Sequence, residues 1–269
     1  MSKTVLITGA STGMGEALTF EYVERGWNVV ATMRDTAKAN PAFADLDTVL
    51  VTALDVTDRA GIEKAVHATI ERFGAIDAVV NAAGYGQLGA VEEVSIDQLR
   101  DQYETNVVGV VQMIQAVLPH MRERGTGHIV NVGSMGGHVS LPTMAVYCSS
   151  KSALQNLTEG LAWELGPLGI HVTLVEPAGF NTNFTASSKF PATSIADYTD
   201  SYATMVEFDK HAVRGDLIKS MAAVADITGT DKPPLHLAVA PAALEMVRGR
   251  FTELMAEYDR WEPVTAATL

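Results

Sequence analysis

The sequence has 269 residues, of which 47% are hydrophobic and 19% charged, and a formal net charge of −13. This composition is that of a globular protein and excludes a disordered chain, while the negative charge argues against nucleic acid or an anionic membrane as a partner. The single cysteine, Cys148, excludes an intrachain disulfide, and no apolar run approaches the roughly 20 residues of a membrane span. We therefore expect a cytoplasmic protein.

Short apolar runs alternate with longer amphipathic segments along the chain. The short runs are rich in β-branched residues, which is typical of strands buried on both faces of a parallel sheet. They comprise residues 5–7, 29–31, 49–51, 78–80, 128–130 and 172–175. The segments between them, for example 15–25, 61–73 and 96–121, have helical periodicity. The alternation predicts an α/β fold: a doubly wound parallel β-sheet, or Rossmann fold, with helices on both faces.

The pattern becomes less regular after residue 175. We expect residues 184–225 to form a substrate loop region with short helices, because ligands bind at the carboxyl edge of such sheets. Residues 236–260 are predicted to add a last strand and a helix. No linker is found, so residues 1–269 are predicted to form a single domain.

A glycine-rich turn lies between the first predicted strand and the first predicted helix. It contains Gly9, Gly13 and Gly15. Glycine permits a tight turn and lets backbone N–H groups approach a pyrophosphate at the start of a helix. Its place in the first βα unit predicts a dinucleotide-binding site.

The end of the second predicted strand bears on the choice of cofactor. A site that prefers NAD presents a carboxylate there for the ribose hydroxyls, but the expected position holds Met33, followed by Arg34 and Asp35. The guanidinium of Arg34 can grip a 2′-phosphate through charge-assisted hydrogen bonds. We therefore expect NADP(H) to be favoured, and NAD(H) remains possible if Asp35 supplies the carboxylate.

Asp55 and Val56 follow the third predicted strand, at the edge where a cofactor would bind. The Asp55 side chain can cap the next helix. It can also accept a hydrogen bond from an adenine amino group, and the two roles are compatible.

Tyr147 and Lys151 stand four residues apart in a predicted helix, so their side chains share one face. A tyrosine has an ordinary pKa of about 10, and a fixed cation beside it lowers that pKa. The pair therefore suits general acid–base catalysis. Ser134, at the end of the fifth predicted strand, and Asn106, in the helix after the fourth, are further candidates. Alone, the serine would be a structural cap, and the asparagine would bond its own backbone.

Together these residues resemble the short-chain dehydrogenase/reductase family over the whole chain. Asn106, Ser134, Tyr147 and Lys151 resemble its catalytic tetrad, and residues 8–15 its cofactor motif. The resemblance implies a cofactor site made of Gly9, Ser11, Thr12, Gly13, Met14, Gly15, Arg34, Asp55, Val56, Asn81, Ala82, Ala83, Gly84, Tyr147, Lys151, Pro177, Gly179 and Thr182.

Two positions depart from the family pattern. Ala82 replaces the second asparagine of the Asn-Asn-Ala-Gly motif, and Ala178 replaces the glycine that usually follows the proline at 177. Both replacements are small, so we expect altered detail rather than lost binding. The C-terminal region resembles a bacterial subgroup of hydroxysteroid- and retinol-dehydrogenase-like members, which does not by itself identify the substrate.

The resemblance also implies the chemistry. Tyr147 would donate a proton to a carbonyl oxygen as the nicotinamide delivers hydride. Lys151 would hold the nicotinamide ribose and lower the Tyr147 pKa. Ser134 would orient the substrate oxygen, and Asn106 would anchor a water that relays protons from Lys151.

The expected function is NADPH-dependent, reversible reduction of a ketone or aldehyde to an alcohol. Alternatives are an NAD-preferring alcohol dehydrogenase and a catalytically silent NADP-binding regulatory or scaffold protein. The expected partner is a small carbonyl or alcohol substrate, and no His and Cys spacing suits zinc, so no metal is predicted.

Family members mostly form dimers or tetramers, which implies a homodimer or homotetramer. The predicted substrate pocket is apolar and draws on Tyr85, Met135, Met144, Phe180 and residues 184–205.

Overall fold

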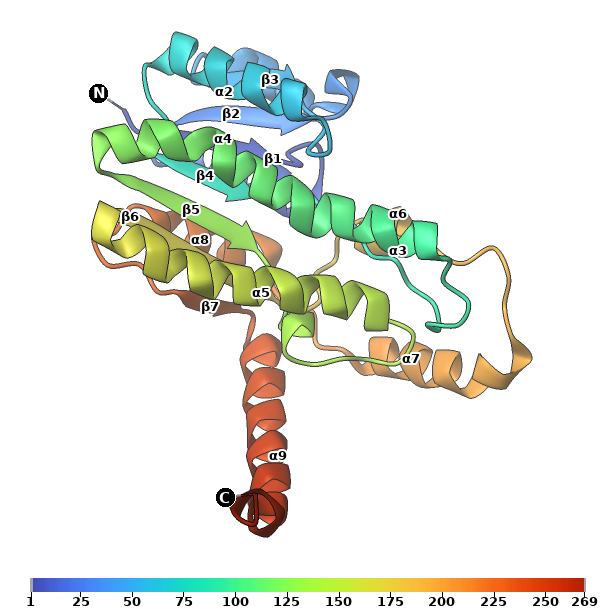
Figure 1. Cartoon of the computed structure of the whole chain (residues 1–269). Coiled ribbons are helices and arrows are strands. Elements are labelled where there is room, and N and C mark those ends of the chain that lie inside the picture. Colours follow the sequence, from blue (N-terminus) through green and yellow to red (C-terminus); the bar gives the residue numbers. More distant parts are fainter. Residues whose placement is uncertain (1, 269) are drawn as a thin grey trace.

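The computed structural model describes residues 2–268. In this part of the chain, seven parallel strands form one sheet in the order β3-β2-β1-β4-β5-β6-β7 (Figure 1). The order of strands changes direction between β1 and β4, where doubly wound sheets bind ligands beyond the carboxyl ends of the strands. The strands are β1 (Thr4–Thr8), β2 (Asn28–Met33), β3 (Val49–Ala53), β4 (Ala78–Asn81), β5 (Gly127–Val132), β6 (Ile170–Pro177) and β7 (His236–Val239).

Helices cover both faces of the sheet, as the sequence predicted. One face packs against α1 (Gly13–Glu24) and α8 (Leu217–Thr228). The other packs against α2 (Arg59–Phe73), α4 (Gly109–Arg124) and α5 (Ala145–Leu165). The remaining helices are α3 (Ile96–Tyr103), α6 (Phe184–Ser187), α7 (Thr199–His211) and α9 (Pro241–Ala266).

The alternation of side chains along β1 explains why the strand is apolar throughout. Val5 and Ile7 belong to the core beneath α1 and α8, whereas Leu6 belongs to the core beneath α2, α4 and α5. All three are fully buried. Burial of such a side chain contributes roughly 1.5–3 kcal/mol, so neither face of the strand tolerates a polar residue without cost.

The helix predicted for residues 96–121 is interrupted. α3 begins with a capping box, in which the Ser95 hydroxyl accepts from the Gln98 N–H and the Gln98 side chain accepts from the Ser95 N–H. A π-helical turn, Glu104–Val108, separates α3 from α4. Such turns insert an extra residue and are frequent at functional sites. Asn106, at the centre of this turn, is buried.

The chain after β6 forms α6, α7 and α8 before it returns to the sheet as β7. α9 then leaves β7 and projects away from the sheet (Figure 1). It continues to Ala266, beyond the predicted end at residue 260. None of the helices in residues 2–268 is both long and apolar enough to cross a bilayer.

Candidate active site

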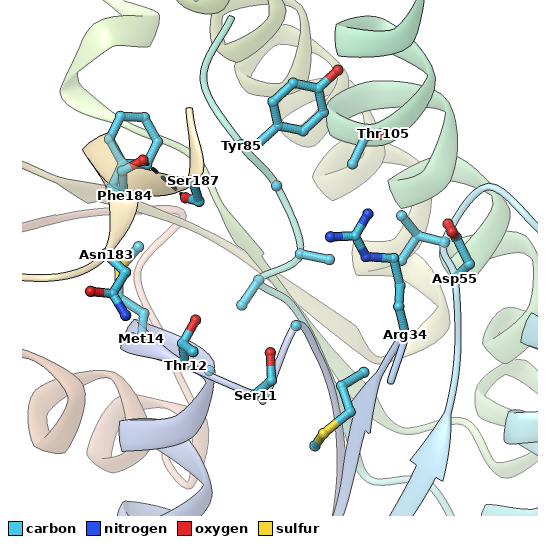
Figure 2. A pocket seen from close by; sticks show the side chains of 18 of the residues that line it. Ser11, Thr12, Met14, Arg34, Asp55, Tyr85, Thr105, Asn183, Phe184 and Ser187 are labelled. Atoms are coloured by element: carbon cyan, nitrogen blue, oxygen red, sulfur yellow. Dashed lines mark hydrogen bonds between the residues drawn. The ribbon is translucent and has the colours of Figure 1, made fainter. Parts of the chain in front are cut away.

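A cavity of about 510 Å³ opens at the carboxyl edge of the sheet, above β1, β2, β3 and β4 (Figure 2). Most residues that were predicted to contact a cofactor line it: Gly9, Ser11, Thr12, Gly13, Met14, Gly15, Arg34, Asp55, Val56, Ala82, Ala83, Gly84 and Thr182. Asn81, Pro177, Gly179, Tyr147 and Lys151 do not line it. The cavity wall is therefore built largely from the turn after β1 and the ends of the neighbouring strands.

The turn after β1 has a backbone that requires glycine. Gly9 and Gly13 have φ angles of 72° and 62°, in the left-handed region. A Cβ on Gly9 would lie 2.8 Å from the Cα of Ala83. A Cβ on Gly15 would lie 2.8 Å from the carbonyl carbon of Gly9. The turn therefore packs backbone against backbone, and the turn and the start of α1 line the cavity, which suits an anionic group.

Replacing Gly15 with alanine is expected to displace this turn and weaken binding of NADP(H) at least about tenfold, a loss of about 1.4 kcal/mol. The matched control is Gly160→Ala in α5, where an added Cβ meets nothing within 4 Å. That change should stabilise the helix, by up to about 1 kcal/mol, and leave cofactor affinity unchanged. Fluorescence titration with NADPH and thermal denaturation measure both effects. Wild-type affinity in Gly15→Ala would contradict the close packing of this turn.

The ends of β1 and β4 are joined by the Thr8 hydroxyl, which accepts hydrogen bonds from the N–H groups of Ala82 and Ala83. Ala82 and Ala83 take part through their backbone N–H groups alone, so the departure at Ala82 does not disturb these bonds. The Asn81 side chain is buried and donates to Asn131, whose own amide donates to Thr158. The Asn81 side chain therefore ties β4 to β5 and α5. Contrary to the predicted cofactor contact, Asn81 does not line the cavity.

Arg34 and Asp35 have separate surroundings. The Arg34 guanidinium lies in the cavity (Figure 2), is exposed, and forms no ion pair within residues 2–268. Asp35 accepts a hydrogen bond from the Ala37 N–H and caps the short 3₁₀ turn Thr36–Lys38. Its carboxylate is thus engaged outside the cavity.

Asp55 does not cap the following helix. Its carboxylate accepts from the N–H and the hydroxyl of Thr57, and the cap of α2 is Asp58, which accepts from the Ala60 N–H. α2 begins at Arg59, so Asp58 and not Asp55 stands at the N-cap position. Asp55 therefore keeps its place on the cavity wall.

Tyr147 and Lys151 lie one turn apart on α5, and both are buried. The Lys151 Nζ donates to the Val132 carbonyl oxygen at 2.8 Å and lies 6.0 Å from the centroid of the Tyr147 ring. Burial lowers the Lys151 pKa to about 8. Burial also raises the Tyr147 pKa to about 12, although the Ser134 hydroxyl partly opposes this. Lys151 was expected to lower the pKa of Tyr147. In the protein without cofactor the Tyr147 pKa is raised instead, because burial has the largest effect on the pKa of both side chains.

Asn106 and Ser134 both organise backbone near Tyr147. The Asn106 side chain accepts from the Tyr85 N–H and donates to the Tyr85 carbonyl oxygen and the Ser150 hydroxyl. Ser134 follows β5, and its hydroxyl accepts from the Gly136 N–H. The structural role expected for a lone serine is therefore correct, since Ser134 caps a turn. The role expected for a lone asparagine is not, because Asn106 fixes the backbone of Tyr85, which lines the cavity, rather than its own turn.

Phe184 stands between Tyr147 and the cavity. Its ring lines the cavity and packs edge-on against the Tyr147 ring, with 5.4 Å between the centroids. Tyr147 keeps only 7% of its surface exposed. Phe180, which was assigned to the substrate pocket, is instead part of the core beneath α1 and α8, and that assignment is wrong.

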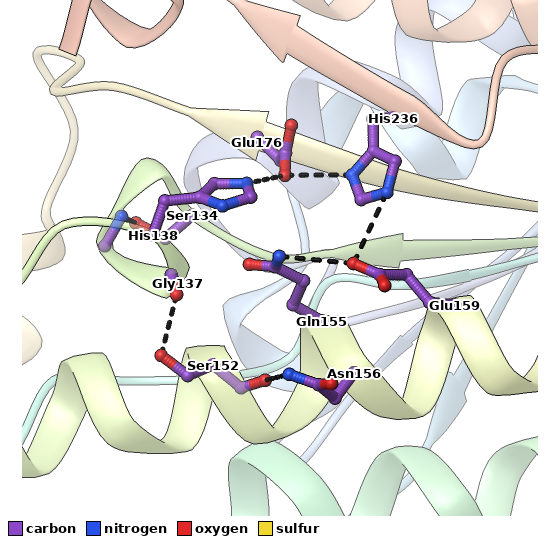
Figure 3. A network of polar contacts seen from close by, with 10 residues as sticks. Ser134, Gly137, His138, Ser152, Gln155, Asn156, Glu159, Glu176 and His236 are labelled. Carbon is purple, nitrogen blue, oxygen red and sulfur yellow. Dashed lines mark hydrogen bonds and ion pairs between the residues drawn. The ribbon is translucent and has the colours of Figure 1, made fainter. Parts of the chain in front are cut away.

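A histidine–glutamate cluster lies on the other side of the Ser134 turn (Figure 3). Glu176 Oε1 lies 2.5 Å from His138 Nε2 and 3.2 Å from His236 Nδ1, and His236 Nε2 lies 3.5 Å from Glu159. Burial raises the Glu176 pKa, but the two histidines together bring it below its usual value. These side chains are spaced to hold a metal ion, and sequence reasoning missed them because they come from distant segments. Each of the three facing atoms already has a hydrogen-bond partner, so the cluster joins the Ser134 turn to β6 and β7.

A comparison with known protein families identifies the family of this chain. The sequence pattern of the family described as short chain dehydrogenase matches residues 3–191. The chain belongs to this family. It is an NAD(P)-dependent oxidoreductase of the short chain dehydrogenase family.

Members of the short chain dehydrogenase family with similar sequences come from fungi and bacteria. The chain is 34% identical to the oxidoreductase BOA17 of Botryotinia fuckeliana, with 100% of both chains covered. It is 34% identical to the 3-ketodihydrosphingosine reductase of Bacteroides thetaiotaomicron, over 88% of this chain and 87% of that one. A solved short-chain dehydrogenase from Streptomyces avermitilis is 36% identical, covers 100% of this chain and 99% of its own, and superposes with a TM-score of 0.93.

Proposed function

We propose that this protein reduces a ketone or an aldehyde to an alcohol with NADPH, reversibly, and that Tyr147 is its general acid and base. The observation that carries the proposal is the convergence of Tyr147, Lys151 and Ser134 at the carboxyl edge of the sheet, directly behind the wall of the cofactor cavity. The residues of the cavity fit a nicotinamide dinucleotide. The backbone-packed glycine turn suits its pyrophosphate, and the Arg34 cation suits a 2′-phosphate.

The bound cofactor supplies the hydride, and the residues of the chain place and protonate the substrate. Tyr147 donates its phenolic proton to the carbonyl oxygen and takes it back in the oxidative direction. Ser134 orients that oxygen. Lys151 would hold the nicotinamide ribose, one helical turn from Tyr147.

Further residues support these groups. Asn106 fixes the Tyr85 backbone and anchors a water in the proton relay from Lys151. Thr182, which lines the cavity, and the nearby Pro177 and Gly179 would hold the nicotinamide carboxamide. Asn81 acts through the strand ends that it ties together.

Arg34 is expected to set the cofactor preference. The wild type should use NADPH better than NADH by one to two decades in kcat/KM, because a charge-assisted contact with the 2′-phosphate contributes about 1.5–3 kcal/mol. Arg34→Ala should remove most of that difference. Lys38→Ala is the matched control, since it removes a nearby exposed cation that does not line the cavity. Equal or better use of NADH by the wild type would favour an NAD-preferring alcohol dehydrogenase and would overturn this assignment.

A turnover screen tests the reaction itself. Ketones, aldehydes, sterols and sugars are each offered with NADPH and with NADH, and nicotinamide absorbance is followed. We expect an apolar carbonyl compound to be reduced, because Met135 and Met144 belong to the predicted substrate pocket and the Phe184 ring packs on Tyr147. Tight NADPH binding without turnover of any compound would instead favour a catalytically silent regulatory or scaffold protein.

We also propose that residues 1–269 act as one domain in the cytoplasm, and that copies associate as a homodimer or homotetramer through the helices that carry Asn106 and Tyr147. Exposed apolar side chains support that surface, with Val108 40% exposed before α4 and Trp163 85% exposed on α5.

A further inference from the structure

α9 carries an apolar stripe along most of its length. Apolar residues recur at alternating spacings of three and four, the repeat of a coiled-coil seam. They are Leu244, Val247, Phe251, Leu254, Tyr258 and Trp261. Phe251 is 49% exposed, Tyr258 62% and Trp261 58%. A stripe of this kind normally packs against the matching stripe of a second helix.

The body of the protein covers one side of the first half of this helix, as far as Leu254, which is half-buried. Ala243 is fully buried, and the Phe251 ring packs edge-on against His138 with 5.4 Å between the centroids. From Met255 to Thr268 every residue is exposed. Figure 1 shows this half projecting beyond the sheet without a neighbouring element. A helical half of this kind is marginal in water unless its apolar side is packed.

Charged residues beside the stripe indicate what packs against it. Arg248 and Arg250 flank the seam in the first half of α9, and Glu257 and Glu262 occupy the equivalent flanking positions in the second half. A parallel pair of such helices would bring like charges together. In an antiparallel pair, Arg248 faces Glu262 of the second copy, and Arg250 faces Glu257 of the second copy, so opposite charges meet.

We propose that α9 pairs with α9 of a second copy of this chain, antiparallel, about a two-fold axis near Leu254. The contact is isologous, because each helix offers the same seam to the other. The projecting half of each helix then lies along the beginning of the other, and its tip reaches the other copy's body. This surface is separate from α4 and α5, so it does not depend on the proposed function.

Cross-linking tests the direction of the pair. In the full chain, Leu254→Cys places two thiols at the axis, and a short bis-maleimide should join most of the protein into a covalent dimer. Leu244→Cys places them about 30 Å apart in the antiparallel arrangement, at 1.5 Å per residue, and should give no dimer. The wild type, whose Cys148 is buried, is the control. Cross-linking of both variants would show a parallel pair, and of neither would show no pair; either result overturns the proposal.

Charge reversal tests the partner without touching the seam. Arg248→Glu with Arg250→Glu should raise the dissociation constant of the α9 contact at least tenfold, as measured by analytical ultracentrifugation. Glu257→Arg with Glu262→Arg should do the same, and an equimolar mixture of the two double variants should recover the association. Circular dichroism checks that both remain folded. Unchanged masses for both variants, or monomers that instead bind lipid vesicles through α9, would overturn the pairing.

Discussion

Tyr147→Phe is expected to lower kcat about a thousandfold while the affinity for NADPH stays within about twofold of the wild type. The change removes one oxygen atom and keeps the ring that packs against Phe184. General acid–base groups contribute about 10²- to 10⁴-fold to a rate, and only the protonation of the carbonyl oxygen depends on this hydroxyl. Steady-state kinetics on the best substrate of the screen, together with a fluorescence titration of the cofactor, measure the two quantities.

Tyr22→Phe is the matched control. Tyr22 is a fully buried tyrosine on α1 whose hydroxyl bonds the Thr228 hydroxyl at 2.9 Å. Its replacement should cost about 1 kcal/mol of stability, the usual contribution of one hydrogen bond, with no effect on turnover. If Tyr147→Phe kept more than about a tenth of the wild-type rate, the acid–base assignment would have to be abandoned.

Lys151→Met is expected to abolish turnover, weaken cofactor binding and yet stabilise the cofactor-free protein near neutral pH. Burial holds the Lys151 pKa at about 8, against 10.5 for the free side chain. The folded protein therefore binds this proton less tightly than the unfolded chain does, which costs about 3 kcal/mol below pH 8. Methionine has a similar length and no charge, so it avoids that cost, although the Val132 carbonyl loses its donor.

The pH dependence separates this effect from a general change in packing. As pH rises from about 8 to 10.5, the unfolded chain still holds the proton and the folded protein has lost it, so the wild type gains stability across that window. Lys151→Met should lack this rise, and its advantage over the wild type should shrink toward pH 10.5. Lys64→Met, at an exposed site on α2, is the control and should follow the wild type. A parallel pH profile for Lys151→Met and wild type would contradict the lowered pKa.

The elements that could be predicted from the sequence are those with a local signature. The strands are apolar on both faces because Leu6 and its neighbours enter different cores, and that pattern is visible in a few consecutive residues. The glycine turn is equally local, since Gly9 and Gly13 need φ angles that other residues avoid. The positions of Tyr147 and Lys151 on one helical face follow from their spacing alone.

What the sequence did not reveal depends on contacts between distant segments. Nothing near Phe184 shows that its ring packs on Tyr147, and nothing near His138 shows that Glu176 and His236 join it. The cap of α2 was assigned to Asp55 rather than Asp58 because a carboxylate near a strand end satisfies the same local rule at either place. The direction of the Tyr147 pKa was missed because burial, unlike spacing, cannot be read from two residues.

The carbonyl substrate that we propose would compete with a side chain of the enzyme itself. To reach the Tyr147 hydroxyl, it has to take space that the Phe184 ring now fills. An edge-on aromatic pair is worth about 0.5–1.5 kcal/mol beyond its buried area, so a small compound that merely displaces the ring binds about two- to tenfold more weakly than its own contacts allow. A compound with a broad apolar body against which the ring can restack recovers that energy. Because Phe184 belongs to a helix of only four residues, the ring can shift without disturbing the sheet. An enzyme that reduces carbonyl compounds at Tyr147, as proposed, would therefore select them by bulk before any bond is broken.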